Sequence, residues 1–132
     1  MNIFVDTSAL YALMDADDRN HTRAGSFWRE ALLRPAGLYC SNYVLVESLA
    51  LIQRRLGIAA VHLFLEAIVP LLQVQWITAD QHAVAVSALL AAGRRDLSLV
   101  DCSSFEVMRQ VGVADVFTFD RHFSDLGFAC HP

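Results

Sequence analysis

The sequence predicts an α/β fold of three layers, in which helices cover both faces of a central parallel sheet of about five strands. Short apolar runs alternate along the chain with longer segments whose apolar residues recur at helical spacing. Helix-capping and turn residues separate the two kinds of segment. Strands that alternate with helices in this way form parallel sheets that are buried on both faces.

The first strand is predicted at residues 2–5, where an apolar run precedes a polar Asp-Thr-Ser turn. Thr7 or Ser8 then caps a short helix, because a hydroxyl side chain accepts a hydrogen bond from the first helical turn. After a polar loop, apolar residues at helical spacing predict a second helix over 22–33. Pro35 ends this helix, since proline cannot continue the helical hydrogen bonds.

A second strand is predicted at 37–40, and Ser41 or Asn42 caps the strongly apolar helix that follows it. Gly57 ends that helix, because glycine readily adopts the backbone conformation of a helix end. Another apolar segment with helical period predicts a helix over 59–72.

A third strand is predicted at 74–77, and Thr78 or Asp80 opens the next helix. Gly93 closes that helix, because glycine is the usual residue just past a helix end. Residues 94–98 are polar and are predicted to form a connection.

The last helix is predicted at 99–110, with Gly112 after its end. Runs rich in valine and phenylalanine then predict strands at 116–119 and 127–130. The chain has neither internal repeats nor low-complexity segments.

The composition limits the possible functions. The chain has 132 residues, 55% of them hydrophobic, which suits a single domain over residues 1–132 with a sizeable core. Its formal net charge is −4 and its ten cationic side chains are all arginines. Binding of nucleic acid through bulk positive charge is therefore not expected, although a local basic rim is compatible with this charge. The lack of lysine excludes mechanisms that need a Schiff base, a P-loop lysine or a lysine general base.

The three cysteines, Cys40, Cys102 and Cys130, are widely spaced and form no C-x-x-C pair. Neither a disulfide framework nor a cysteine zinc site is expected, and a reducing, cytoplasmic setting fits best. The N-terminal segment lacks the basic start of a signal peptide, and the apolar runs are too short or too interrupted to cross a membrane. The mean hydropathy of +0.40 predicts an apolar surface that a partner covers.

Four acidic residues lie where burial is expected. Asp6 and Asp120 follow strands, at the end where parallel α/β sheets bind their ligands. Glu47 lies within an apolar helix, and Asp101 lies at the start of another. Clustered carboxylates need a compensating charge, which Mg²⁺ or Mn²⁺ would supply through oxygen ligands. Such an ion polarises a phosphodiester and lowers the pKa of a bound water, so no serine, cysteine or histidine nucleophile is required.

The segments VDTSAL, YVLVESLALI, LSLVD and TFDRHF carry these acids in this order along the chain. Together they resemble the motifs of the PIN-domain ribonucleases, and within them those of the VapC-type toxins of bacterial toxin–antitoxin pairs. The resemblance covers essentially the whole chain and implies a single PIN domain. It implies that the catalytic and metal-binding acids are Asp6, Glu47, Asp101 and Asp120. Asp96, just before LSLVD, is a candidate for a fifth or outer-shell acid.

The resemblance also implies an activity and partners. The expected protein is a Mg²⁺- or Mn²⁺-dependent endoribonuclease that uses a metal-activated water and leaves a 5′-phosphate and a 3′-hydroxyl. It is expected to be the toxin of a type II pair, to form a homodimer, and to be inhibited by a small antitoxin in its acidic groove. The RNA that it cuts is left open by the sequence.

Each acid also has a structural interpretation. These interpretations are helix caps for Asp6 and Asp101, an ion pair with Arg54 or Arg55 for Glu47, a turn for Asp120, and an ion pair with Arg94 or Arg95 for Asp96.

Several polar residues near the acids have open roles. His122 is expected to be a surface histidine rather than a general acid. The hydroxyls of Thr7, Ser8 and Thr118 are candidates for hydrogen bonds to the acids, although capping and strand propensity explain them equally well.

The alternative function is a non-catalytic PIN-like module that binds RNA or protein without cutting it. A phosphatase of the haloacid-dehalogenase type is disfavoured, because Ser8 stands where a second aspartate is needed and the required lysine is absent. Metal-dependent cleavage of RNA separates the nuclease from the binding module.

Overall fold

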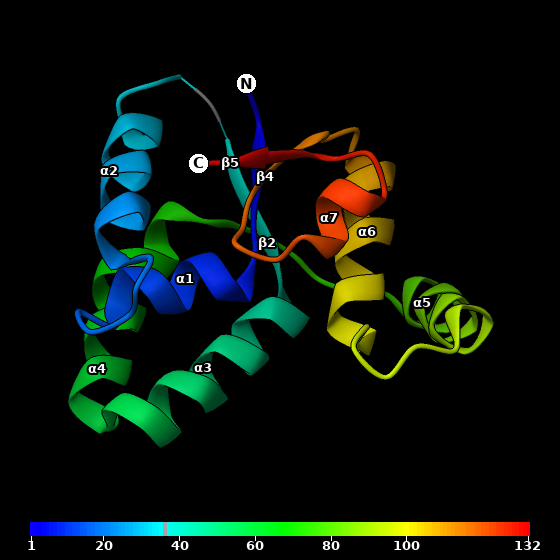
Figure 1. The fold of residues 1–132 in the computed structure, drawn as a ribbon, viewed down its shortest axis with the longest axis horizontal. Coiled ribbons are helices and arrows are strands. Elements are labelled where there is room, and N and C mark those ends of the chain that lie inside the picture. The colour runs from blue at the N-terminus through cyan, green and yellow to red at the C-terminus, as the bar shows by residue number, and fades with distance from the viewer. Residues whose placement is uncertain (36) are drawn as a thin grey trace.

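The sheet consists of five short strands, β1 (Ile3–Val5), β2 (Leu38–Ser41), β3 (Gln73–Gln75), β4 (Asp115–Phe117) and β5 (Ala129–His131). They lie side by side in the order β3-β2-β1-β4-β5, and every neighbouring pair is parallel. The computed structural model describes residues 1–35 and 37–132. The predicted fold class is confirmed, because helices cover both faces of this parallel sheet (Figure 1).

The helices are α1 (Thr7–Met14), α2 (His21–Leu32), α3 (Asn42–Leu56), α4 (Ile58–Leu63), α5 (Ala79–Ala92), α6 (Leu99–Val111) and α7 (His122–Asp125). Figure 1 shows α1 and α2 on one side of the strands and α6 and α7 on the other. Helix α5 packs on the outside of α6, and α3 contacts both α1 and α6. Helix α3 therefore lies next to both the helix that follows β1 and the helix that carries Asp101.

The segment predicted as a helix over 59–72 is helical over 58–71, but its regular α-helical hydrogen bonding breaks after residue 63. After α4 the chain forms a π-helical turn at Phe64–Ile68 and a 3₁₀ turn at Val69–Leu71. Pro70 explains the break, because it lacks a backbone N–H and its ring crowds the carbonyl one turn earlier. A second difference is α7, a single turn of helix after β4 that was not predicted.

The two central strands form the middle of the core. All three residues of β1 are at most 1% exposed, and Val116 and Phe117 of β4 are 0% exposed. This burial is expected of strands that helices cover on both faces. The rings of Phe27 and Phe117 lie 4.8 Å apart and attach α2 to the sheet.

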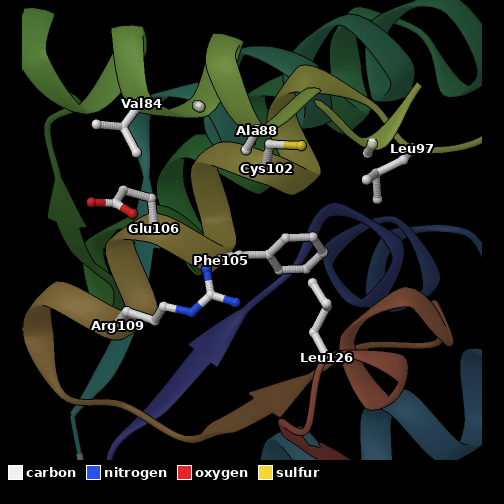
Figure 2. A pocket seen from close by; sticks show the side chains of 10 residues that line it. Val84, Ala88, Leu97, Cys102, Phe105, Glu106, Arg109 and Leu126 are labelled. Carbon is white, nitrogen blue, oxygen red and sulfur yellow. The ribbon is translucent and has the colours of Figure 1, made fainter. Parts of the chain in front are cut away.

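Helix α5 lies at the periphery of the fold. Among the described residues of this helix, Ala85 is the buried side chain. Val84 and Ala88 line a mainly apolar cavity of about 240 Å³ together with Phe105 of α6 and Leu126 (Figure 2). Within residues 1–35 and 37–132, no helix combines the length and the apolar character needed to cross a membrane.

The centre of the sheet positions the site. Val5 of β1 pairs with Phe117 of β4, so the residues that follow these strands emerge side by side. From β1 the sheet extends through β2 to β3 on one side, and through β4 to β5 on the other. Such a switch point is where α/β proteins bind ligands, beyond the carboxyl ends of the strands.

Candidate active site

Asp6 follows β1 directly and is the N-cap of α1. The residue is only 4% exposed. Its Oδ2 accepts hydrogen bonds from the hydroxyls of Ser8 at 2.7 Å and Thr118 at 3.0 Å, and from the backbone N–H of Ser8 at 3.3 Å. The capping interpretation is therefore correct, and the same contacts fix a buried carboxylate at the switch point of the sheet.

The hydroxyls of Ser8 and Thr118 connect Asp6 to the loop after β4. Ser8 Oγ accepts a hydrogen bond from the backbone N–H of Phe119 at 3.0 Å, and Thr118 Oγ1 accepts one from that of Asp120 at 2.9 Å. Each hydroxyl thus donates to Asp6 and accepts from the loop. The predicted hydrogen bonds of Ser8 and Thr118 to an acid are confirmed, and they couple the position of Asp120 to that of Asp6.

Asp101 lies in the first turn of α6, where it forms a capping box with Ser98. Asp101 Oδ2 accepts a hydrogen bond from the Ser98 N–H at 3.0 Å, and Ser98 Oγ accepts one from the Asp101 N–H at 3.0 Å. The capping interpretation is correct for this residue also. A carboxylate accepts up to about four hydrogen bonds or ligand contacts. The carboxylate of Asp101 can therefore bind a cation while it accepts the hydrogen bond of the capping box.

His122 lies against Asp120, and its side chain is only 12% exposed. The expectation of a surface histidine was therefore wrong. Nδ1 of His122 lies 2.8 Å from Asp120 Oδ1, but it is not aligned for a hydrogen bond and has no partner among the described residues. The backbone N–H of His122 donates to the same oxygen at 2.9 Å. The sequence signal for this residue is its position in TFDRHF, two residues after the acid.

Asp96 contacts the other ring nitrogen of His122. His122 Nε2 lies 3.2 Å from Asp96 Oδ2, and the Arg94 guanidinium donates to both oxygens of Asp96, at 3.1 and 2.9 Å. The alternative ion pair of Asp96 with Arg94 is thus present. The Arg94 guanidinium holds the pKa of Asp96 well below its ordinary value, and the hydrogen bond from His122 acts in the same direction. Asp96 is therefore connected to the acidic site by His122, which contacts both Asp96 and Asp120.

Glu47 lies apart from the other acids. It is half-buried on α3 and lines a groove of about 350 Å³ with Leu99 and Val100, which precede Asp101 on α6. Among the described residues Glu47 forms no ion pair with an arginine, which disfavours its structural interpretation. The groove connects Glu47 to the start of α6.

Burial raises the pKa of two acids at the switch point, and neighbouring negative charge adds to the rise. Burial raises the pKa of Asp6 from 3.8 to about 6 against its hydrogen bonds to Ser8 and Thr118, and the negative charge of Asp101 adds to the rise. Burial also raises the pKa of Asp101, and the charge of Asp120 contributes. When buried carboxylates that lie close together ionise at neutral pH, their negative charges need a compensating positive charge. A divalent cation would supply it.

The donor set at the switch point fits a metal ion. Asp101, Asp120 and His122 each offer one ligand atom, and these atoms all lie within 4.8 Å of one another. Carboxylate oxygens and an imidazole nitrogen are common ligands of divalent ions, and the Nδ1 of His122 has no other partner in the described residues. Of the predicted acids, Asp101 and Asp120 share this cluster. Asp6 is joined to it through hydroxyls, whereas Glu47 lies outside it.

Comparison with known proteins identifies a matching family and a relative that aligns with this chain over nearly its whole length. Residues 3–129 match the PIN domain. The chain is 38% identical over 130 residues to the 23S rRNA-specific endonuclease VapC20 of Mycobacterium tuberculosis, covering 96% of this chain and 95% of that protein. The crystal structure of Mycobacterium tuberculosis VapC20, described as a sarcin-ricin loop cleaving toxin, has a TM-score of 0.85 at 35% identity and 97% coverage of both chains.

Two more distant structures share the fold. FitAcB of Neisseria gonorrhoeae has a TM-score of 0.70 at 17% identity, with 98% of this chain and 96% of that chain covered. VapBC2 of Rickettsia felis, bound to a DNA fragment from its promoter, has a TM-score of 0.73 at 12% identity, with 99% and 98% covered. With the family match over residues 3–129 and a 38% identical relative aligned nearly end to end, this chain belongs to the PIN-domain family.

Proposed function

We propose that this protein is a metal-dependent endoribonuclease and the toxin of a type II toxin–antitoxin pair. The observation that carries the proposal is the cluster of Asp101, Asp120 and His122 beside the buried Asp6, at the switch point of a PIN-domain sheet. A relative with 38% identity is named an endonuclease specific for 23S rRNA. This relative supports the same reaction class for the present chain.

We assign metal binding and catalysis to Asp6, Glu47, Asp101 and Asp120, with Mg²⁺ or Mn²⁺ as the ion. When bound, such an ion supplies the charge that polarises the phosphodiester and favours the ionisation of water. Asp6 contributes a carboxylate whose orientation its hydroxyl partners fix before substrate binds. Asp101 and Asp120 contribute from α6 and from the loop after β4. Asp96 is assigned an outer position.

Hydrolysis joins the oxygen of water to phosphorus and breaks the bond to the 3′ oxygen of the RNA strand. The products are then a 5′-phosphate and a 3′-hydroxyl. The role of the acidic cluster is to hold the positive charge of the cation beside the scissile phosphate. Positioning and charge stabilisation of this kind are the main requirements of phosphoryl transfer.

A groove beside Asp120 is suited to the RNA backbone. Arg23, Phe119 and Arg121 line it together with Asp120, and its volume is about 220 Å³. The guanidinium carbon of Arg23 lies 5.6 Å from the centre of the Phe119 ring, which favours a cation at this rim. Arginine side chains bind phosphate oxygens in a bidentate manner. The net charge of −4 therefore coexists with a local basic rim that guides RNA to the acids.

Removal of either arginine is expected to weaken RNA binding more than turnover. Arg23→Gln and Arg121→Gln should each raise KM about tenfold with little change in kcat, because a hydrogen bond to a charged group contributes about 1.5 kcal/mol or more. Each should also reduce the slope of log KM against log salt by about 0.7–1. Steady-state cleavage over a series of salt concentrations measures both quantities.

Arg34→Gln is the matched control for these two variants. Arg34 is exposed beyond the carboxyl end of α2, whereas Arg23 lies in the first turn of the same helix. A KM and a salt slope equal to those of the wild type in both Arg23→Gln and Arg121→Gln would contradict the assignment of this groove to RNA.

The proposed substrate is 23S rRNA, and within it the sarcin-ricin loop. The support is that the relative VapC20 is named for this RNA and described as cleaving this loop. Proteins that read RNA sequence mostly bind loops with exposed bases, and an open groove beside the acids suits such a target.

An antitoxin and a second copy of the chain are the proposed protein partners. The relative VapC20 is described as a toxin, which supports an antitoxin that covers the acidic groove. A homodimer is supported by the mean hydropathy of +0.40 and by exposed apolar side chains, among them Trp76 at 74% and Leu90 at 75% exposure, because a partner can cover such side chains. The proposed ribosomal RNA substrate supports a cytoplasmic location for the protein.

A cleavage assay with purified, antitoxin-free protein tests the proposal. The protein is expected to cut 23S rRNA into discrete fragments with Mg²⁺ or Mn²⁺ and to leave it intact with EDTA. Asp101→Asn should abolish the fragments, whereas Asp125→Asn, an exposed acid on α7, should retain them. Retention of intact RNA by the folded wild type without fragments under any condition would instead support the non-catalytic binding module.

A further inference from the structure

We propose that His122 is a nitrogen ligand of the cation site, that Asp96 and Arg94 hold it in place, and that it makes the site prefer Mn²⁺ to Mg²⁺. The inference rests on the metal requirement proposed above and deepens it. The predicted site is built from oxygen ligands alone, so an imidazole among them would change the choice of ion.

Nδ1 of His122 is positioned as a ligand atom. It is buried and has no hydrogen-bond partner in the described part of the chain. It lies 2.8 Å from Asp120 Oδ1, and neighbouring ligand atoms of an octahedral ion with bonds of about 2.1 Å are about 3 Å apart. Asp101 places a carboxylate oxygen within 4.8 Å of an Asp120 oxygen and of a ring nitrogen of His122. The three atoms thus converge from two separate segments of the chain.

Asp96 and Arg94 explain why the imidazole presents this nitrogen. Nε2 of His122 lies 3.2 Å from Asp96 Oδ2, and an imidazole that donates from Nε2 keeps the lone pair of Nδ1 for a metal. Arg94 binds both oxygens of Asp96, at 2.9 and 3.1 Å, so the carboxylate is itself held in place. Metal-binding histidines are generally oriented by a carboxylate or carbonyl in this manner.

The competing explanation is that a protonated His122 only neutralises Asp96 and Asp120. The two explanations predict effects of opposite sign. Removal of a ligand weakens the binding of the ion, whereas removal of a positive charge beside two carboxylates strengthens it. The poor alignment of Nδ1 with the nearby Asp120 oxygen favours the ligand, because a protonated Nδ1 would donate a hydrogen bond there.

A nitrogen ligand affects Mn²⁺ and Mg²⁺ differently. Mg²⁺ is a hard ion that is bound almost entirely by oxygen, and it gives up its water reluctantly. Transition ions accept imidazole more readily than Mg²⁺ does, and Mn²⁺ is one of them, although it binds most weakly in their affinity series. The ratio of the Mg²⁺ dissociation constant to the Mn²⁺ dissociation constant is therefore the quantity that reports the role of His122.

Calorimetric titration of the metal-free, full-length protein with Mn²⁺ and with Mg²⁺ measures this ratio without RNA. His122→Ala is expected to weaken Mn²⁺ binding by at least about tenfold and Mg²⁺ binding much less. Asp96→Ala should lower the ratio in the same direction by about tenfold, as the loss of an orienting partner does in other metal sites. Circular dichroism establishes that each variant is folded.

His131→Ala is the matched control, because His131 forms a similar pair with Asp115 at 2.9 Å outside the cluster. It should leave both dissociation constants unchanged. Equal or tighter binding of both ions to His122→Ala, or losses by the same factor, would overturn the inference. A further outcome is that Asp101→Asn loses the binding of both ions while His122→Ala keeps the wild-type ratio of the Mg²⁺ to the Mn²⁺ dissociation constant. That result would leave the metal requirement intact and remove only the role of His122. A wild type that binds neither ion would remove both.

Discussion

Asp6→Asn is expected to abolish RNA cleavage and, at the same time, to stabilise the metal-free protein. The substitution removes the charge of a carboxylate that is 4% exposed and lies beside Asp101. Loss of a charge that helps to hold a catalytic ion affects the transition state by several kcal/mol, which corresponds to a decrease in rate of at least about 10³-fold. Asparagine retains an oxygen that accepts the hydrogen bonds of Ser8 and Thr118.

The gain in stability has a separate cause. Burial raises the pKa of Asp6 to about 6, so at pH 7 the ionised group destabilises the folded protein by about 3 kcal/mol. A neutral side chain removes this cost, and a gain of about 1–3 kcal/mol is expected after some loss of hydrogen bonding. Urea unfolding at pH 7 with a chelator measures the gain, and the cleavage assay measures the loss.

Asp17→Asn is the control for both measurements, because Asp17 is an exposed acid in the loop between α1 and α2. It should change neither cleavage nor the free energy of unfolding appreciably. Wild-type turnover in Asp6→Asn would remove Asp6 from the catalytic site. A stability below that of the wild type at pH 7 would show that the hydrogen bonds outweigh the charge.

The metal-free wild type is expected to lose stability as the pH rises from about 4 to about 6. The unfolded chain releases the Asp6 proton near pH 3.8, whereas the folded protein retains it until about pH 6. The stabilisation is therefore complete below the lower pKa and disappears as the pH passes the higher one, by about 3 kcal/mol. Asp101, whose pKa is also raised, adds to the decline. Asp96 has a lowered pKa and opposes it weakly, since its side chain is 55% exposed.

Urea unfolding at several pH values, with a chelator present, measures this decline. Mg²⁺ or Mn²⁺ at about 100 times its dissociation constant should then restore about 2.7 kcal/mol at pH 7. Asp6→Asn should show a flatter profile than the wild type over the same range. A wild-type stability that increases through this range and does not respond to either ion would contradict the electrostatic description of the site.

The sequence predicted the sheet and most helices because their signals are local. Thr78, one of the two residues predicted to open its helix, forms a capping box in the structure, and Gly93 and Gly112 end the helices that precede them with left-handed backbone. The observed strands begin or end one or two residues away from the predicted positions, as at β5. The reason is that pairing with the neighbouring strand, here β4, decides where a strand begins and ends. The four-residue helix α7 was missed since one turn is too short to show a periodicity.

The sequence also predicted the candidate acids and their order along the chain, but it did not predict which of them lie close together in the folded protein. Asp101 and Asp120 meet because α6 and the loop after β4 converge, which no local pattern specifies. The contact of His122 with Asp96 joins residues 26 positions apart in the chain. Glu47 has a matching motif but lies in a neighbouring groove rather than in the cluster. Tertiary packing therefore decides which acids share one site.

The hydroxyl contacts that join the two halves of the site have a consequence for the timing of activity. Thr118 reaches Asp6 across 112 positions of the chain, and Ser8 reaches Phe119 across 111. During translation, β1 emerges long before β4, so a nascent chain lacks the loop that completes the acidic cluster. Because the acidic cluster needs the loop after β4, we expect cleavage competence only once that loop has left the exit tunnel. For a protein whose proposed target is ribosomal RNA, this order of assembly delays attack on the ribosome that is synthesising it.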